Sequence, residues 1–297
     1  MQFFLEVLIG GLLSGIMYSL VALGYVLIYK ASGVFNYAQG SMVFMAALTT
    51  VGFTEHGVNF WLAIALTMVT MVALAMLTEK LVLRPLVNQP EITLFMATIG
   101  LSFFIEGLAQ LVWGSTVRKL ELGIEDVPME ALMEATGMAI SQFDLVAAGI
   151  AAALVAALAV FFSKTKIGRA LRAVADDHQA ALAVGIPLQH IWAIVWSVAG
   201  FVALVAGLLW GSRNGVQFSL TFLALKALPV LILGGFTSVP GAIIGGLIIG
   251  ASEKLAEVYL GPMVGGGIEG WFPYILALAF LLVRPEGLFG ERIIRRI

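Results

Sequence analysis

Two ionisable side chains lie inside long apolar stretches of this 297-residue chain. Glu106 lies within the apolar stretch 92–113, and Lys226 lies within 219–236. Each would cost roughly 2.5–3.5 kcal/mol at the centre of a bilayer, so such residues normally face a bundle interior or a water-filled path. We hypothesise that Glu106 pairs with a cation, and Lys226 is the candidate. For Lys226, snorkelling to the nearer membrane interface is the alternative.

A second group of polar residues interrupts the apolar stretch 34–53. Its opening, VFNYAQGSMVF, brings hydrogen-bond donors and acceptors close together on Asn36, Tyr37, Gln39 and Ser41. Backbone breaks at membrane depth are tolerated only where protein or a watery cavity satisfies the freed groups. Interrupted helices often mark the binding region of a transporter. Two hypotheses stay open: these side chains contact a solute, or they only satisfy freed backbone groups.

Several kinds of chemistry are absent from the sequence. Cys is absent, and the three histidines, His56, His178 and His190, lie far apart, so neither a disulfide nor a metal site is expected. No G-x-x-x-x-G-K-[ST] stretch is present to cradle ATP phosphates, and no catalytic triad or His-Glu-x-x-His helix is found. The net charge of −2 gives no nucleic-acid footprint. We expect neither an enzyme nor a bound cofactor.

The composition indicates whether water or membrane lipid surrounds the chain. It is 61% hydrophobic and 11% charged, with a mean hydropathy of +1.02, whereas an ordinary soluble domain is about 45–50% apolar and about 25% charged. Membrane lipid must therefore surround much of the chain. The first apolar stretch has no basic n-region and is too long for a signal peptide. We predict an all-α polytopic membrane protein that forms one membrane domain over residues 1–297.

Apolar stretches of about 20 residues define the candidate membrane spans. The predicted spans are 4–29, 34–53, 60–78, 92–113, 143–162, 191–211, 219–236, 271–283 and, more weakly, 239–252. The sequence therefore predicts about eight to nine transmembrane helices, some of them broken or re-entrant.

Basic residues predict the orientation, because short cytoplasmic loops carry an excess of Lys and Arg. The densest basic run is Lys164, Lys166, Arg169 and Arg172, which places the loop 163–190 in the cytoplasm. The arginine-rich C-terminal tail is then also cytoplasmic, and the N-terminus and the acidic loop 114–142 lie outside.

Small residues recur at four-residue spacing in two of the spans. They are Gly11, Gly15 and Ser19 in the first, and Gly241/Gly245 and Gly246/Gly250 near the end. Such spacing lets two helix backbones approach closely in lipid. We interpret these rows as helix-packing faces; a surface along which helices slide is the alternative.

The cytoplasmic loop 163–190 has an apolar and a charged face at helical spacing. Gly185 suits the end of that helix, and Pro187 prevents its continuation. The loop is either a solvated amphipathic helix or a docking element for a cytoplasmic partner.

The same loop carries a family resemblance. Gln179-Ala180-Ala181 followed by Gly185 resembles the EAA loop of ABC importer permeases, with Gln in place of the usual Glu. The segment IGRALRAVADDHQAALAVGI resembles the corresponding loop of LivH-type permeases for branched-chain amino acids. Further stretches resemble the same family, in the family's order and over nearly the whole chain: GLLSGIMYSLVALGYVLIY, VFNYAQGSMVF, EKLVLRPL, LKALPVLILGGFTSVPGAIIGGLIIG and RPEGLFG.

The resemblance implies one membrane subunit of an ATP-driven importer in a bacterial inner membrane. It implies a second related permease, two ATP-binding subunits that use the ATP, and an extracytoplasmic substrate-binding protein. It also implies that the loop couples to an ATPase subunit, through Arg172, Asp176, Asp177, Gln179, Ala180, Ala181 and Gly185. Asp176 or Asp177 is the candidate to replace the missing Glu.

The resemblance also implies a substrate class: Leu, Ile and Val, or related small solutes such as urea and amides. A zwitterion needs donors for its carboxylate and acceptors for its ammonium. The predicted pathway residues supply both: Asn36, Tyr37, Gln39, Ser41, Glu106 and Lys226. The alternative function is a stand-alone channel or secondary transporter, which would explain the broken helices but not the docking-like loop.

Overall fold

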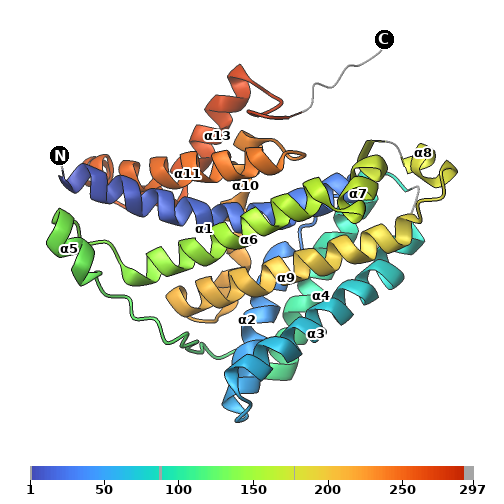
Figure 1. Ribbon diagram of the computed structural model, residues 1–297, viewed down its shortest axis with the longest axis horizontal. Helices are drawn as coiled ribbons and strands as arrows, with labels where there is room; N and C mark the ends of the chain where they lie inside the picture. Colours follow the sequence, from blue (N-terminus) through green and yellow to red (C-terminus); the bar gives the residue numbers. More distant parts are fainter. Residues whose placement is uncertain (1, 87–88, 177, 291–297) are drawn as a thin grey trace. The chain divides into compact units, whose positions relative to one another are not determined.

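The computed structural model describes residues 2–86, 89–176 and 178–290, except for the side chains of residues 175–179 (Figure 1). Within that part every regular element is a helix, and β-structure is limited to two isolated bridges, Arg118–Val216 and Pro128–Ser141. The predicted all-α membrane fold is confirmed.

Six helices of the described chain are long and apolar enough to cross a membrane. They are α1 (Gln2–Ser32), α3 (Phe60–Thr78), α4 (Glu91–Trp113), α6 (Gln142–Lys164), α9 (Leu188–Asn214) and α11 (Val239–Tyr259). Helix α3 continues through a π-helical turn, η1 (Glu79–Leu83), and a 3₁₀ turn, η2 (Arg84–Leu86). The span predicted most weakly, 239–252, is therefore one of the long helices, because it continues to Tyr259.

Three apolar segments are shorter. They are α2 (Gln39–Glu55), η3 (Phe218–Phe222) running into α10 (Leu223–Gly234), and α13 (Phe272–Val283). Helix α10 contains Pro229, which cannot donate its backbone hydrogen bond. Each of the nine predicted segments thus contains a helix within the described residues. The expected interruption in 34–53 is also present, because the helix begins only at Gln39.

The remaining helices are short and lie in the connections. They are α5 (Glu130–Thr136), α7 (Lys166–Asp176), α8 (His178–Ala183), α12 (Gly261–Val264) and η4 (Ile268–Gly270).

The chain forms two compact units, each assembled from separate stretches of sequence. Unit 1 comprises Met1–Ala22, Gly123–Ala156 and Leu225–Ile297, and unit 2 comprises Leu23–Leu122 and Ala157–Ala224. Helices α1, α6 and α10 each contribute residues to both units.

In unit 1, helices α1 and α11 lie side by side with their small residues in contact (Figure 1). A Cβ added at Gly11 would lie 2.7 Å from the Gly250 carbonyl oxygen, and one added at Gly250 would meet the Gly11 carbonyl. The Ser19 hydroxyl donates across the same interface to the Ile243 carbonyl at 3.2 Å. Only residues without bulky side chains permit this approach. The helix-packing interpretation of the glycine rows is confirmed.

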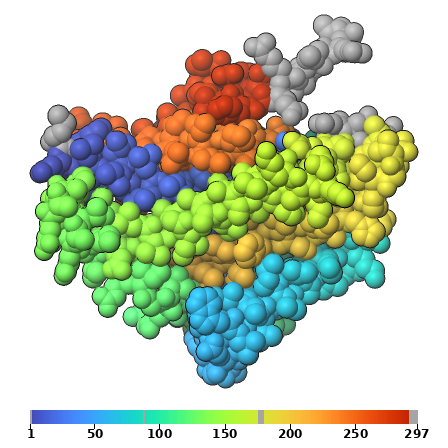
Figure 2. Space-filling view, in the orientation of Figure 1, coloured from blue at the N-terminus to red at the C-terminus, as the bar shows by residue number. Residues whose placement is uncertain are grey.

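In unit 2, helix α9 packs against both α2 and α3. A Cβ at Gly207 would lie 2.6 Å from the Val43 carbonyl oxygen, so α9 approaches the backbone of α2 closely. Helix α2 is buried along almost its whole length, whereas α3 exposes large apolar side chains such as Trp61 and Val69. Figure 2 shows this uncovered face of α3 in light blue. In a membrane protein such a face suits lipid or another subunit.

Candidate functional site

Asn36 lies in the non-helical turn before α2 and Gln39 is the first residue of α2, and both are fully buried. The Asn36 carbonyl oxygen accepts from the Ala38 backbone N–H at 3.1 Å, and its amide donates to Gln39 Oε1 at 3.4 Å. The Gln39 amide donates to the Ala199 carbonyl of α9 at 3.4 Å. The Asn36–Ala38 bond satisfies a backbone group that the broken helix frees, as one of the two hypotheses for these residues expects. Contact of either side chain with a solute stays a prediction.

Tyr37 lies within the same turn, and its surroundings are largely aromatic. Its backbone N–H donates to Thr98 Oγ1 at 3.1 Å, and its ring meets Phe95 edge-on, 6.3 Å between centroids. Both partners lie on α4. The side chain is half-buried, so packing accounts for its position.

Ser41 and Glu106, which the sequence singled out separately, form one cluster between α2 and α4. Ser41 Oγ donates to Glu106 Oε1 at 2.7 Å, and Ser102 Oγ donates to the same oxygen at 3.3 Å. The two serine hydroxyls lie 2.5 Å apart. Ser102 and Glu106 are one helical turn apart on α4, so both side chains lie on the face of α4 that contacts α2. The buried carboxylate, 8% exposed, is thus held by neutral hydroxyl donors.

Lys226 of α10 pairs with Glu253 of α11, with 3.2 Å between Nζ and Oε1. The Tyr18 hydroxyl of α1 donates to the same oxygen at 3.1 Å. The Lys226 ammonium also lies over the Tyr18 ring, 5.9 Å from its centroid. All three residues belong to unit 1. Glu253, rather than the hypothesised Glu106, is the carboxylate that pairs with Lys226 in the structure.

Sequence reasoning missed Glu253 because the predicted span ended at residue 252. The helix instead continues to Tyr259 and includes Glu253. A signal was available, since Glu253 follows Gly246 and Gly250 at the i+7 and i+3 spacing of one helix face. A carboxylate on a helix-packing face needs a partner, and Lys226 supplies it.

Helices α7 and α8 form the loop between α6 and α9. Leu171, Val174 and Ala181 are buried, so the predicted apolar face is present. On the other face Arg172 is exposed, and its guanidinium donates to the Ser163 carbonyl at 3.2 Å.

The end of α8 is a Schellman motif. The Ile186 N–H donates to the Ala181 carbonyl, and the Gly185 N–H donates to the Leu182 carbonyl, both at 3.0 Å. Gly185 has φ +84°, the left-handed conformation that favours glycine. Pro187 then precedes the first residue of α9. The predicted helix end at Gly185 is confirmed.

This cap leaves an exposed apolar edge on the loop. Leu182 and Val184 are 54% and 76% exposed, Ala180 is exposed, and a Cβ added at Gly185 would meet nothing within 4 Å. The other predicted coupling residues lie outside the description: Asp177 entirely, and Asp176 and Gln179 in their side chains.

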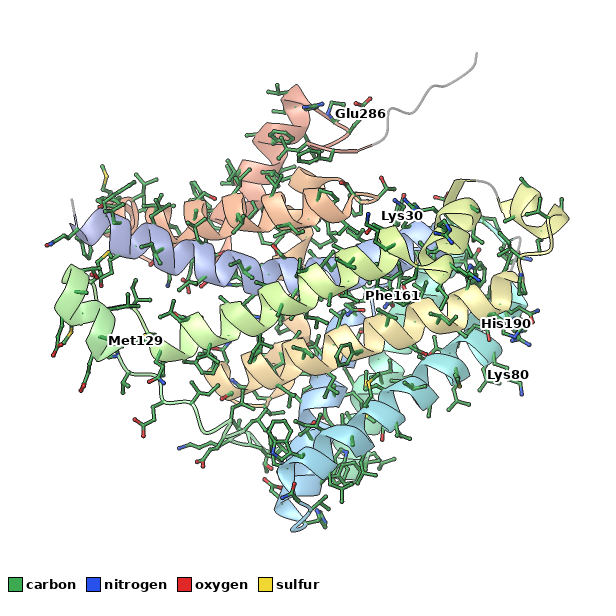
Figure 3. All side chains as sticks on the ribbon, in the orientation of Figure 1. Lys30, Lys80, Met129, Phe161, His190 and Glu286 are labelled. Atoms are coloured by element: carbon green, nitrogen blue, oxygen red, sulfur yellow. The ribbon has the colours of Figure 1, made fainter. Side chains whose placement is uncertain are left out.

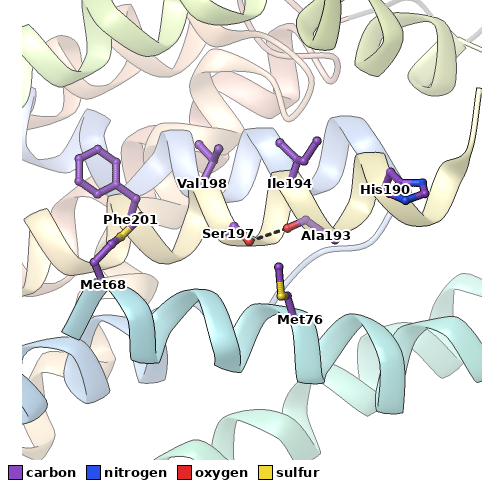
Figure 4. A pocket seen from close by; sticks show the side chains of 8 residues that line it. All are labelled: Met68, Met76, His190, Ala193, Ile194, Ser197, Val198 and Phe201. Carbon is purple, nitrogen blue, oxygen red and sulfur yellow. Dashed lines mark hydrogen bonds between the residues drawn. The ribbon is translucent and has the colours of Figure 1, made fainter. Parts of the chain in front are cut away.

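An apolar groove of about 360 Å³ runs between α3 and α9 (Figure 4). It is lined by Met68, Met76, His190, Ala193, Ile194, Ser197, Val198 and Phe201. The Ser197 hydroxyl donates to Ala193 within its own helix at 2.7 Å. Figure 3 places His190 and Lys80 at the same end of the α3–α9 pair. A zwitterion would lose its hydration in this groove with few polar groups to replace it, so the groove does not suit such a solute.

A multi-pass helical fold with polar clusters inside its spans and a capped helical loop between two spans suits a membrane transport subunit. Within the described residues, no group of three His, Cys, Asp or Glu could hold a metal ion. The family model for the permease component of the branched-chain amino acid transport system matches residues 7–283, and the chain belongs to this family. Its role is transport rather than catalysis.

Individual relatives agree over the full length. The chain is 29% identical to the high-affinity branched-chain amino acid transport system permease protein LivH of Escherichia coli K12, covering 99% of this chain and 98% of the relative. It is 26% identical to the corresponding protein BraD of Pseudomonas aeruginosa, with the same coverage. The solved structure of PsaBC from Streptococcus pneumoniae in complex with Fab aligns at a TM-score of 0.48 and 15% identity, covering 92% of this chain and 89% of that chain. That likeness is too weak to support a conclusion.

Proposed function

We propose that this chain forms half of the translocation pathway of an ATP-driven importer for branched-chain amino acids. One observation carries the proposal: the match to the permease family extends over residues 7–283, so it includes the membrane spans and the loop between them. The names of the LivH and BraD relatives supply the substrate class.

The proposed assembly has four kinds of partner. A second related permease completes the pathway, two ATP-binding subunits hydrolyse ATP, an extracytoplasmic binding protein delivers the substrate, and membrane lipid surrounds the spans. The chain has no P-loop, which supports hydrolysis by separate subunits. The basic loop 163–190 supports an inner-membrane orientation with the N-terminus outside and the C-terminus in the cytoplasm.

We assign coupling to the loop formed by α7 and α8. Its exposed edge at Leu182 and Val184, fixed by the cap at Gly185, suits a groove on an ATPase subunit. The proposed coupling residues are Arg172, Asp176, Asp177, Gln179, Ala180, Ala181 and Gly185. Burial of an apolar edge gives affinity, and the rigid cap presents that edge in one orientation.

The proposed pathway residues are the polar side chains within the spans: Asn36, Tyr37, Gln39, Ser41, Glu106 and Lys226. The buried clusters at Ser41–Glu106 and at Lys226 support this assignment, because such groups at membrane depth commonly mark a solute path.

Co-purification tests the assembly. The tagged chain is extracted from its host in a mild detergent, and its companions are identified by mass. Two ATP-binding subunits and a second permease are expected. Recovery of the chain alone, or only as a homo-oligomer, in several detergents would contradict the importer and favour the stand-alone channel or secondary transporter.

A further inference from the structure

Glu253 and Tyr18 have no role in the pathway described so far, yet they form a polar centre between two candidate spans, α1 and α11. The Glu253 side chain is only 7% exposed, whereas Lys226 is 36% exposed. One side of the ion pair is therefore buried against α1, and the ammonium side is accessible.

Stability does not account for this ion pair. A buried pair is often no more stabilising than apolar residues of similar volume. Helices α10 and α11, which the pair joins, are already held together by close backbone contacts of Gly245 with Val230 and of Gly234 with Gly241. An apolar pair at positions 226 and 253 would therefore serve equally well if packing were its purpose.

The cluster also has hydrogen-bonding capacity to spare. Lys226 and Tyr18 both bond to Oε1 of Glu253, and Oε2 accepts no hydrogen bond within the described part of the chain. The Lys226 ammonium has three donors, of which Glu253 takes one. The spare groups are thus an anionic acceptor and cationic donors, the complement of an α-ammonium and an α-carboxylate.

We infer that Lys226 and Glu253 bind the two charged ends of the transported amino acid, Lys226 the carboxylate and Glu253 the ammonium. The Tyr18 hydroxyl holds Glu253 in place while Lys226 turns to the substrate. The ion pair within the protein is exchanged for two ion pairs with the zwitterion, so the net charge of the site stays zero throughout. This inference rests on the proposed function, and it adds Glu253 and Tyr18 to the substrate site.

The test uses the complete complex in liposomes with the leucine-loaded binding protein. The double variant Lys226→Met/Glu253→Gln removes both charges and keeps an acceptor for Tyr18. We expect it to assemble, to unfold close to the wild-type temperature and to hydrolyse ATP when the loaded binding protein is added. Its leucine uptake should fall at least about tenfold, because the loss of about 1.4 kcal/mol of binding free energy weakens binding tenfold.

The matched control is Lys254→Met/Glu269→Gln, which neutralises an exposed pair in the same unit, 3.9 Å apart. Its uptake should equal that of the wild type. An exposed ion pair contributes little to stability, and this pair lies outside the proposed substrate site. Wild-type uptake by the Lys226/Glu253 double variant would overturn the inference.

If the double variant does not assemble, Glu253→Gln alone takes its place, and normal uptake by it would overturn the inference equally. Failure of both to assemble would assign the pair a structural role and also overturn it. An assembled wild-type complex that takes up no leucine would instead contradict the proposed function.

Discussion

Two buried carboxylates in the membrane spans are held in opposite ways. Glu253 in unit 1 meets a cation, Lys226, and a phenol, Tyr18. Glu106 in unit 2 meets two serine hydroxyls, and within the described chain no salt bridge involves it. Hydroxyl donors replace part of the lost hydration of a carboxylate but do not balance its charge. The two sites should therefore respond differently when a single charge is removed.

The largest effect is expected at the ion pair. Lys226→Met leaves Glu253 buried with only the Tyr18 hydroxyl, and breaking one partner of a buried pair costs about 3–5 kcal/mol. Unfolding of the purified chain in detergent should show this loss. The second change Glu253→Gln should restore most of it, because it removes the unpaired charge. A single variant as stable as the wild type would show that the pair is already well solvated.

The next effect concerns the helix interface that carries Glu253. In the structure Gly250 faces the backbone of α1 at Gly11 and Gly15, with no room for a side chain. Gly250→Leu should force the helices apart and cost about 1–3 kcal/mol, as overpacking does. Gly10→Ala is the matched control, because nothing lies within 4 Å of an added Cβ there. Equal stability of the two variants would mean that α1 and α11 do not need this close approach.

The comparison also shows what can be predicted from sequence. Apolar length identified the positions of the spans, and the four-residue glycine rows identified packing faces on α1 and α11, but not that these two faces meet. The Gly185 cap followed from local turn chemistry, because glycine readily adopts the left-handed conformation that ends a helix and Pro187, two residues later, prevents the helix from continuing. These features depend on neighbours within a few residues along the chain.

Partners across helices could not be predicted in the same way. Ser41 and Glu106 were both recognised, but their contact depends on the packing of α2 on α4. The partner of Lys226 was assigned incorrectly because Glu253 lay one residue beyond the expected span. A polar residue inside a span indicates that a partner exists, whereas the partner's identity follows only from tertiary structure.

At the second carboxylate the expected effect on stability is smaller. Glu106→Gln keeps an oxygen acceptor for Ser41 and removes the uncompensated charge, so we expect a change within about 1.5 kcal/mol, the range of one hydrogen bond. Leucine uptake by the complex should nevertheless fall, because the pathway loses a charged group. Ser102→Ala is the control for the hydrogen bonds alone. Unchanged folding and unchanged uptake in Glu106→Gln would remove Glu106 from the pathway.

A substitution at Gly185 should affect stability only locally, because this residue lies far along the chain from either carboxylate and leaves both sites intact. Gly185→Val places a β-branched residue at φ +84°, a strain of about 1–2 kcal/mol that falls on the short helix α8. Gly185→Asn is the matched variant, because Asn tolerates the left-handed conformation. If the cap orients the exposed edge at Leu182 and Val184, the Val variant should lose leucine-dependent ATP hydrolysis and uptake together, and the Asn variant should keep most of both. That pattern would differ from the one expected at Lys226 and Glu253, where hydrolysis continues and uptake stops. Loss of uptake with normal hydrolysis in Gly185→Val would instead mean that this loop acts on the pathway and not on the ATPase.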